Sequence, residues 1–196
     1  MKKRHLRAVA LIVFAVMASM VVVLDRITKT LAENALGGGN TQDFIPGVLD
    51  FQLVYNTGAA WGMFEGARTL FLVIAVLVVG AMIAYVALTP RHNVLTILGL
   101  GMIAGGAVGN AIDRALSGRV VDFIHTLFIE FPLFNVADSA ITVGVILFLI
   151  ATLFGARDEK GARAEKREAP AEGGQADKGG PTDKGGQQKE PTDAPL

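Results

Sequence analysis

The sequence predicts an all-α membrane protein, a four-transmembrane-helix bundle with a small extracytoplasmic β-rich segment. Hydrophobic residues make up 52% of the 196-residue chain, although its C-terminal part is almost entirely polar. Four nearly uncharged windows have the roughly 20 residues that a helix needs to cross a hydrocarbon core of about 30 Å. These windows are residues 8–24, 69–88, 94–112 and 136–154.

The first window follows the basic stretch "MKKRHLR", which is also typical of the start of a cleaved signal peptide. The apolar run is long for a signal peptide, and it ends in "VVVLDR" without a small-x-small cleavage site. We therefore favour a retained first helix over a signal peptide.

Lys and Arg in short flanking segments tend to remain cytoplasmic. They precede the first window, occur in the turn "LTPRHN" between the second and third, and follow the fourth: Lys2, Lys3, Arg4, Arg7, Arg91, Arg157, Lys160 and Arg163. Both termini are thus expected in the cytoplasm. The loops at residues 25–68 and 113–135 then lie on the outer side.

The outer loops contain candidate strands. Apolar and polar residues alternate in "GVLDFQLVYN", which is the period of a strand, and "DFIHTLFIEF" is rich in strand-forming residues up to Pro132. A small sheet on the outer membrane surface is the expected result. The "NTGAAWG" stretch after the first strand predicts a turn, with Trp61 at the membrane interface.

Residues 155–196 are rich in Gly, Pro, Lys, Glu and Asp, and such a segment buries too little apolar area to offset the entropy of ordering it. We expect a membrane domain at residues 1–154 and a disordered polar cytoplasmic tail at 155–196. The formal net charge is zero, which gives no electrostatic reason for a nucleic-acid partner. The chain has no cysteine, so neither disulfides nor thiol chemistry is available.

The third window carries glycines at four-residue spacing: Gly101, Gly105 and Gly109. A stripe without side chains lets a neighbouring helix approach closely. Packing within the chain is favoured over a homodimer seam, and we expect a monomer.

Four acids fall at helix ends on the same outer side: Asp25, Asp113, Asp122 and Asp138. Ionisable groups at membrane depth are costly and usually mark a functional site. Simpler interpretations exist for three of them. Asp25 and Lys29 are four residues apart, as are Asn110 and Arg114 around Asp113, so pairs on a helix surface explain them. Asp138 suits a helix N-terminus with Asn135 as its cap.

Two carboxyls held together can share one proton and hydrolyse a peptide without a metal ion or a nucleophilic side chain. Asp122 has mostly apolar neighbours, which favours its protonated form, whereas a helix start favours the ionised form of Asp138. No HExxH metalloprotease motif occurs, and we expect no metal ion or cofactor. A Ser139 and Lys29 dyad is a weaker alternative, and a lone loop histidine such as His125 is more often structural.

Several stretches together resemble the lipoprotein signal peptidase family, the bacterial signal peptidase II enzymes. They are "LDRITK", "YNTGAAWGMF", "GGAVGNAIDRALSGRVVDFI" and "FPLFNVADSAITVG", and the likeness extends over residues 1 to about 154. The chain departs from the family pattern at Arg26, where Gln is common, and at Trp61, where Phe is common.

The resemblance implies an aspartic endopeptidase of the bacterial cytoplasmic membrane, with its active site at the outer face. Its catalytic pair would be Asp122 of "VVDF" and Asp138 of "NVAD". The substrates would be prolipoproteins with a diacylglyceryl group on a cysteine, cut just before that cysteine, with membrane lipid around the site. The resemblance also implies a set of site-supporting or substrate-binding residues: Asp25, Lys29, Asn56, Gly58, Asn110, Asp113, Arg114, Asn135 and Ala137.

Two other classes of protein remain as alternatives. A small transporter that binds a cation at the outer acids would need polar residues deep within the helices, and the helix centres hold none. An inert membrane scaffold would leave the clustered Asp, Asn and Gly motifs unexplained. If the chain is a peptidase, the strand-rich loop and the "NTGAAWG" turn are expected to close over the substrate.

Overall fold

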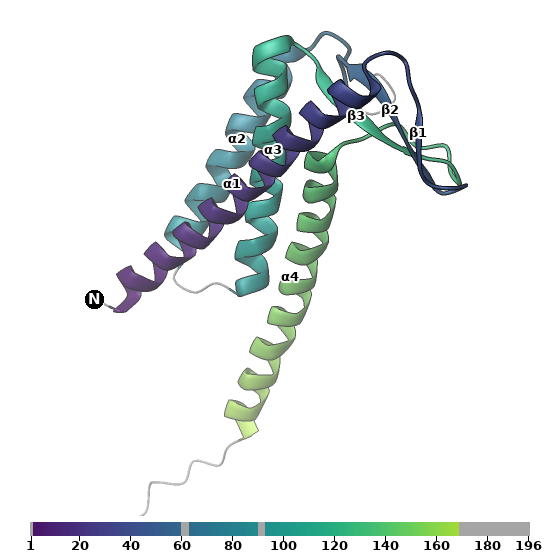
Figure 1. Cartoon of the computed structure of the whole chain (residues 1–196). Coiled ribbons are helices and arrows are strands. Elements are labelled where there is room, and N and C mark those ends of the chain that lie inside the picture. The colour runs from purple at the N-terminus through teal and green to yellow at the C-terminus, as the bar shows by residue number, and fades with distance from the viewer. Residues whose placement is uncertain (1, 60–62, 90–92, 169–196) are drawn as a thin grey trace, which may run out of the picture. The chain divides into compact units, whose positions relative to one another are not determined.

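The computed structural model describes residues 2–59, 63–89 and 93–168, with side chains at 4–59, 63–89 and 93–154. Trp61, Arg91 and the predicted tail from residue 169 onward lie outside these ranges. The chain divides into two compact units, residues 1–159 and 160–196. The arrangement described below is that of the first unit, up to residue 159 (Figure 1).

The helices are α1 (Lys2–Leu36), α2 (Arg68–Leu88), α3 (Val94–Ser117) and α4 (Val136–Glu168). Within the described residues, four helices are long and apolar enough to cross a membrane, which confirms the predicted class. Two bounds differ from the prediction, because α1 continues beyond residue 24 and α4 beyond residue 154. Charged residues end an apolar window, but they do not end a helix.

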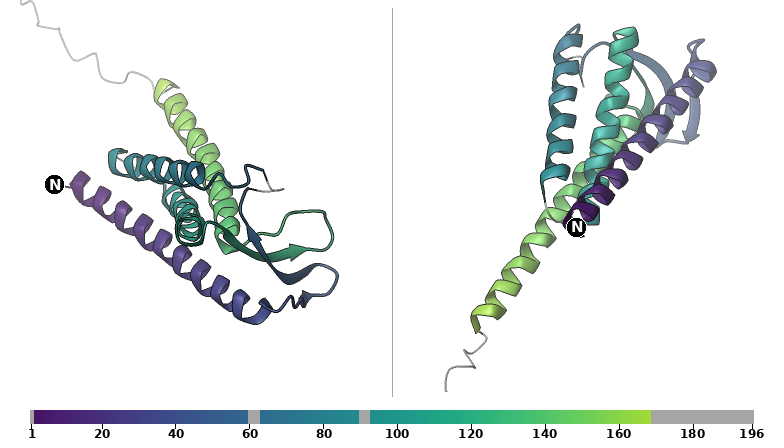
Figure 2. Two further views of the ribbon diagram at one scale, coloured as in Figure 1. Left: turned by 90° about the horizontal axis from the view of Figure 1, so that it is seen from above. Right: turned by 90° about the vertical axis from the view of Figure 1, so that its left-hand side faces the viewer.

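Helix α3 is the central helix, with α1, α2 and α4 arranged around it (Figure 2). Half of its apolar window is buried inside the protein, whereas only 6% of the window of α2 is. Glycines allow this close approach. An added Cβ at Gly105 would lie 2.6 Å from the backbone oxygen of Ala18 on α1, and one at Gly99 would lie 2.7 Å from that of Gly144 on α4. An added Cβ at any member of the predicted stripe would crowd an atom of α1, so the stripe packs within the chain, as predicted.

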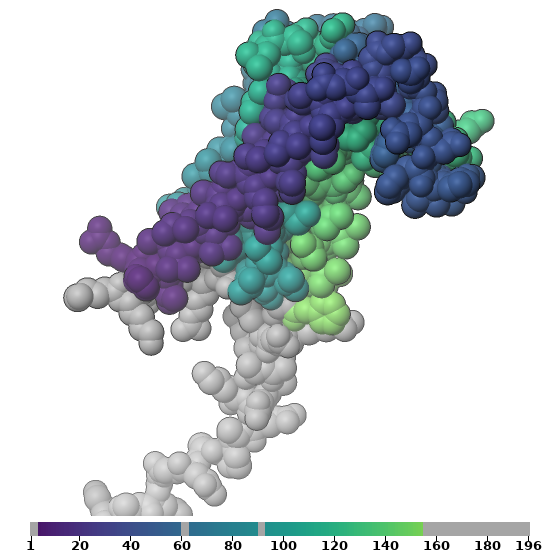
Figure 3. Space-filling model, viewed as in Figure 1, coloured from purple at the N-terminus to yellow at the C-terminus, as the bar shows by residue number. Residues whose placement is uncertain are grey.

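Side chains from α1, α2 and α3 form the core of the helical layer. Its buried members are Ala10, Phe14, Val86, Ile97, Leu100 and Ala104. Helix α1 lies diagonally across α3 in the space-filling view (Figure 3). The first window is thus part of the folded core.

A three-stranded antiparallel sheet lies next to the C-terminal end of α1. Its strands are β1 (Gln42–Ile45), β2 (Leu49–Asn56) and β3 (Val120–Thr126), in the order β1-β2-β3. The two predicted strands correspond to β2 and β3, although β3 begins before "DFIHTLFIEF" and ends well before Pro132. Strand β1 was not predicted. A second core, built from Ala32, Leu36 and Phe123, joins α1 to the sheet.

Backbone hydrogen bonds tie the segment before α4 to β3. The Phe134 carbonyl accepts from Phe123 and Ile124 at 3.1 and 2.9 Å, and Phe134 N–H donates to the Ile124 carbonyl at 3.1 Å. The start of α4 is thereby held beside the middle of β3.

Candidate active site

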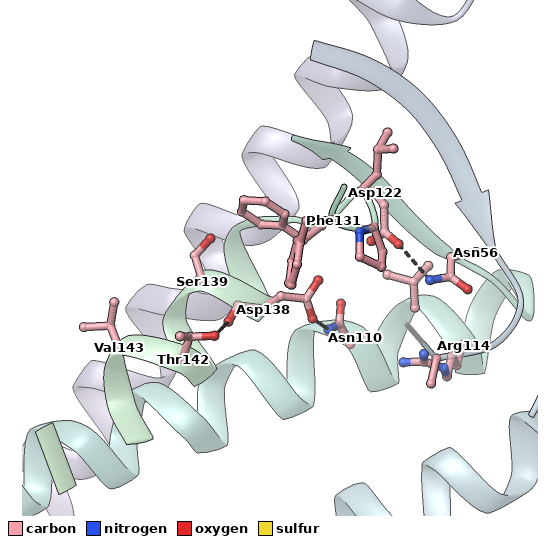
Figure 4. A pocket seen from close by; sticks show the side chains of 14 residues that line it. Asn56, Asn110, Arg114, Asp122, Phe131, Asp138, Ser139, Thr142 and Val143 are labelled. Atoms are coloured by element: carbon pink, nitrogen blue, oxygen red, sulfur yellow. Dashed lines mark hydrogen bonds between the residues drawn. The ribbon is translucent and has the colours of Figure 1, made fainter. Parts of the chain in front are cut away.

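Two acids from different elements line one cavity of about 650 Å³. Asp122 comes from β3 and Asp138 from the first turn of α4 (Figure 4). Successive residues of a strand face opposite ways, so Phe123 turns to the core while Asp122 faces the cavity. Asp122 is only 3% exposed. Apolar side chains make up much of the remaining wall, among them Val120, Phe131, Phe134 and Val143.

Asn135 binds both acids. It directly precedes α4 and is fully buried, and its Oδ1 accepts the backbone N–H of Asp138 at 3.0 Å. In return, Asp138 Oδ2 accepts the backbone N–H of Asn135 at 3.1 Å, which completes a capping box. Asn135 Nδ2 also donates to Asp122 Oδ1 at 2.7 Å. The predicted cap is therefore present, and it reaches the second acid as well.

Two further amides complete the surroundings of the acids. Asn56 at the end of β2 donates from Nδ2 to Asp122 Oδ2 at 2.9 Å, and Asn110 on α3 donates from Nδ2 to Asp138 Oδ1 at 2.8 Å. Each carboxyl thus accepts two N–H groups, all four of them from uncharged partners. Neutral donors hold the carboxyls in place without fixing either one in its ionised form.

The surroundings of Asp122 change its acidity. The pKa of its carboxyl is raised from 3.8 to about 6, because burial and the nearby Asp138 charge raise it by more than the hydrogen bonds from Asn56 and Asn135 lower it. Burial has the largest effect because a desolvated carboxylate is costly. Asp122 can therefore carry a proton at a pH where an ordinary carboxyl cannot.

A buried ion cluster lies directly behind the amides. Lys29 is 1% exposed, and its Nζ lies 2.7 Å from Asp25 Oδ2 and 2.7 Å from Asp113 Oδ2. Asp113 also pairs with Arg26, whose side chain is 44% exposed. The predicted pairing of Asp25 with Lys29 is thus present, but it is buried rather than on the helix surface.

Asp25 also reaches the start of α4. Its Oδ1 accepts the backbone N–H of Ala137 at 3.0 Å, so an acid on α1 caps a helix 112 residues further along the chain. Ala137 is fully buried, and an added Cβ at Gly109 would lie 2.7 Å from Asp25 Oδ2. The small side chain of Ala137 and the missing one of Gly109 therefore leave room for this contact.

Gly58 and Arg114 fix the turn after β2. Gly58 N–H donates to Asn56 Oδ1 at 2.9 Å, which orients the Asn56 amide with its nitrogen toward Asp122. Arg114 Nη2 donates to the Gly58 carbonyl at 2.8 Å, and its guanidinium lies 4.3 Å from the centre of the Phe71 ring. Arg114 thus binds this turn rather than pairing along α3 with Asn110.

All the residues predicted for the site therefore lie in one connected network around the cavity. The apolar wall and the hydroxyls of Ser139 and Thr142, which line the cavity too, were not predicted. The spacing of Ser139 and Thr142 on the first turns of α4 was the one signal in the sequence that could have indicated these hydroxyls. Ser139 Oγ donates to the Asn135 carbonyl, and Lys29 Nζ donates to Asp25 and Asn110, so no Ser and Lys dyad forms between these residues.

His125 lies outside this network. Its Nδ1 is 2.9 Å from Asp50 Oδ1 and 2.8 Å from Gln52 Nε2, across β2 and β3. Over the described part of the chain, no group of three or more His, Asp or Glu side chains has the arrangement of a metal site.

Comparison with known proteins agrees with this arrangement. The family model described as signal peptidase (SPase) II matches residues 17–154. The chain belongs to the signal peptidase II family. The matched range includes both acids of the cavity, the three amides and the ion cluster, so the family assignment covers the whole network.

Individual relatives extend this agreement. The chain is 43% identical over 152 residues to a lipoprotein signal peptidase of Geobacillus thermodenitrificans, covering 76% of this chain and 95% of the relative. It is 39% identical over 156 residues to one of Enterococcus faecalis, covering 80% and 95%. A solved bacterial membrane enzyme is 35% identical, with a TM-score of 0.69 over 74% of this chain and 90% of that enzyme. Both the family and the fold inferred from the sequence are confirmed.

Proposed function

We propose that this member of the signal peptidase II family is an aspartic endopeptidase that removes the signal peptide from diacylglyceryl-modified prolipoproteins. It cuts immediately before the lipid-modified cysteine, with Asp122 and Asp138 as the catalytic pair. The observation that carries the proposal is that these carboxyls line one cavity and both bind Asn135. Family membership favours this function over a cation transporter or a scaffold.

The reaction needs one proton on the pair. The ionised carboxylate takes a proton from water as the water oxygen attacks the scissile carbonyl carbon, and the protonated carboxyl gives its proton to the carbonyl oxygen. When the tetrahedral intermediate collapses, the C–N bond breaks and the leaving nitrogen takes the proton that the base gained from water. A hydroxyl of the intermediate returns its proton to the other carboxyl, which restores the pair. Burial raises the pKa of Asp122, so Asp122 is the acid and Asp138 the base, although the pair titrates as a unit.

The position of the cavity suits a lipid-modified substrate. Ser139, Thr142 and Val143 extend its wall along α4, a helix long and apolar enough to cross a membrane. The acyl chains of the modified cysteine stay in the bilayer, so the bond beside it cannot move far into water. A pair of acids at the start of a spanning helix would meet that bond at the level of the lipid headgroups.

The membrane orientation belongs to the same proposal. Basic residues before α1 and after the apolar part of α4 favour cytoplasmic termini, which puts the sheet and both acids at the outer face. The glycine stripe of α3 is used for packing within the chain, which is consistent with a monomer surrounded by membrane lipid.

The test is cleavage of a diacylglyceryl-modified precursor peptide by the purified full-length protein in detergent, with the released signal peptide as the readout. Asp122→Asn and Asp138→Asn should each lower the rate by roughly 10³-fold or more. Asp50→Asn is the matched control, because Asp50 is a buried acid of the same sheet that pairs with His125 outside the cavity. A near wild-type rate in either cavity variant would remove that residue from the pair.

A further inference from the structure

The contacts behind the catalytic pair give Lys29 a specific task. We infer that Lys29 is a positioning residue: it orients the Asn110 side-chain amide so that the amide nitrogen faces Asp138. This inference rests on the proposed function, because it gives the orientation of a neutral amide a role in the chemistry of the pair.

The orientation follows from what each partner can donate or accept. Lys29 Nζ donates to Asn110 Oδ1 at 3.0 Å, and Asn110 Nδ2 donates to Asp138 Oδ1 at 2.8 Å. An ammonium group has only donors, so it must face the amide oxygen, which turns the amide nitrogen to the opposite side. The cation thus selects one of the two amide orientations without touching Asp138.

Lys29 cannot readily move away from this contact. Its ammonium group donates hydrogen bonds to Asp25 Oδ2 and Asn110 Oδ1, and Asp113 Oδ2 lies 2.7 Å away as a second ion-pair partner. Lys29 is 1% exposed and Asn110 is 9% exposed, so water has little access as a substitute partner. The geometry is therefore fixed from the buried side.

Charge compensation alone does not require the Asn110 contact. Asp25 and Asp113 carry two negative charges, and Lys29 and Arg26 carry two positive ones, so the ion cluster is already neutral. The contact from Lys29 to a neutral amide is the connection between this cluster and the cavity. Asn110 Oδ1 also accepts from Asn135 Nδ2 at 3.2 Å, which ties the same oxygen to the residue that binds both acids.

Loss of the cation has a predictable consequence. Without Lys29, only the longer contact from Asn135 Nδ2 at 3.2 Å still holds the Asn110 oxygen, so the amide can turn over more easily and present its oxygen to Asp138. An oxygen can accept only from a protonated carboxyl. The base form of Asp138 would then lose a donor and face an acceptor. The other charged groups around Asp138 are Asp122 on β3 and Arg114 on α3, which line the same cavity and stay in place.

The experiment measures kcat/KM against pH for the full-length protein with the diacylglyceryl-modified peptide. Lys29→Met keeps the length of the side chain and removes the donor. We expect the acidic limb of the profile to move to higher pH by about one unit, which is a loss of about tenfold on that limb and a smaller loss at higher pH, since a hydrogen bond to a charged group is at stake. The loss should appear in kcat rather than in KM.

A second substitution tests whether Lys29 acts through Asn110. Asn110→Leu removes the amide, so adding Lys29→Met to it should cause no further shift of the limb. Additive shifts, or an unchanged profile in a well-folded Lys29→Met protein, would overturn the inference. If Lys29→Met behaves like the wild type while Asp138→Asn is inactive, the inference about Lys29 is overturned and the proposed function stands. If Asp138→Asn is active, the proposed function itself is overturned.

Two controls separate orientation from charge and from folding. Arg26→Gln removes a cation that binds the same Asp113 but makes no contact with Asn110, so the limb should stay in place. A shift as large as that of Lys29→Met would show that the effect is only one of charge. If Lys29→Met does not fold, the double variant Lys29→Met/Asp113→Asn replaces it. Its ion cluster stays neutral because Asp25 and Arg26 remain, and the same pH profile is measured on it.

Discussion

Two sets of acids lie side by side in this protein and are held by different kinds of partner. Asp25 and Asp113 are paired with Lys29 at 2.7 Å each, and Asp113 also with Arg26. The acids of the cavity accept instead from the neutral groups of Asn56, Asn110 and Asn135: Asp122 and Asp138. A cation fixes a carboxyl in its ionised form, whereas an amide holds it in place and leaves its proton free to come and go.

The comparison explains how four acids at one place can serve two purposes. The cation-paired acids join α1, α3 and the start of α4, so their charge is structural. The amide-bound acids face a cavity and share one protein partner, so their charge can change during a reaction. The nature of the partner, rather than burial, separates the two sets, because three of the four acids are almost completely buried.

The largest expected effect on stability comes from Asp113→Asn. This change leaves a buried ammonium with one acid fewer, and breaking a buried pair costs about 3 kcal/mol or more. We expect a clearly lower Tm in detergent. Asp122→Asn is the matched variant, because it also replaces a buried acid by its amide, and its Tm should change little while its activity is lost. Equal shifts of Tm in both variants would contradict the distinction between the two sets.

The pH dependence of the reaction tests the amide-bound set. The folded pKa of Asp122 is about 6 rather than 3.8, so its proton is present below pH 6 and is lost above it. The one-proton form of the pair then declines, and kcat/KM should fall about tenfold per pH unit on the alkaline side.

The Asn56→Ala variant tests the direction in which the alkaline limb moves when the pKa of Asp122 changes. The Asn56 amide lowers the pKa of Asp122, so its removal should raise that pKa further and move the falling limb to higher pH. A limb that moves to lower pH, or does not move, would show that Asp122 does not carry the proton in question.

The sequence was sufficient to predict the helices and the residue types of the site. Apolar windows located the four helices, and the "NVAD" stretch contained both the cap Asn135 and the acid Asp138. The sequence was not sufficient to predict the contacts between distant elements. The contacts of Asp25 with Ala137 and of Lys29 with Asn110 depend on how α1 packs against α3 and meets the start of α4, which local periodicity does not determine.

Strand β1 and the full length of α1 could not be predicted from the sequence for a related reason. Strand β1 has four exposed residues, so it lacks the alternation that revealed β2. The extension of α1 to Leu36 was hidden by Asp25, Arg26 and Lys29, whose charges end an apolar window but are compensated in the folded protein. Charge within a helix is thus informative about function and misleading about its bounds.

A smaller effect is expected when the cation-paired set is disturbed without any change of charge. In Gly109→Ala, the new Cβ would lie 2.7 Å from Asp25 Oδ2, so the carboxylate must move, at a cost of about 1–3 kcal/mol. Gly80→Ala on α2 is the control, because its Cβ would meet nothing within 4 Å and alanine favours a helix. A lower Tm for Gly109→Ala alone is the expected result, and equal values would show that the close contact carries no stability.

The smallest effect concerns the exposed member of the cation-paired set. Arg26 is 44% exposed, so its pair with Asp113 is screened by water and salt, whereas Lys29 is shielded from both. Arg26→Gln should lower the free energy of unfolding by no more than about 1 kcal/mol, and this difference should vanish at about 1 M salt. The deficit of Asp113→Asn should persist at the same salt concentration, because the contact with Lys29 is buried. If salt removed both deficits alike, burial would not be what distinguishes the two cations.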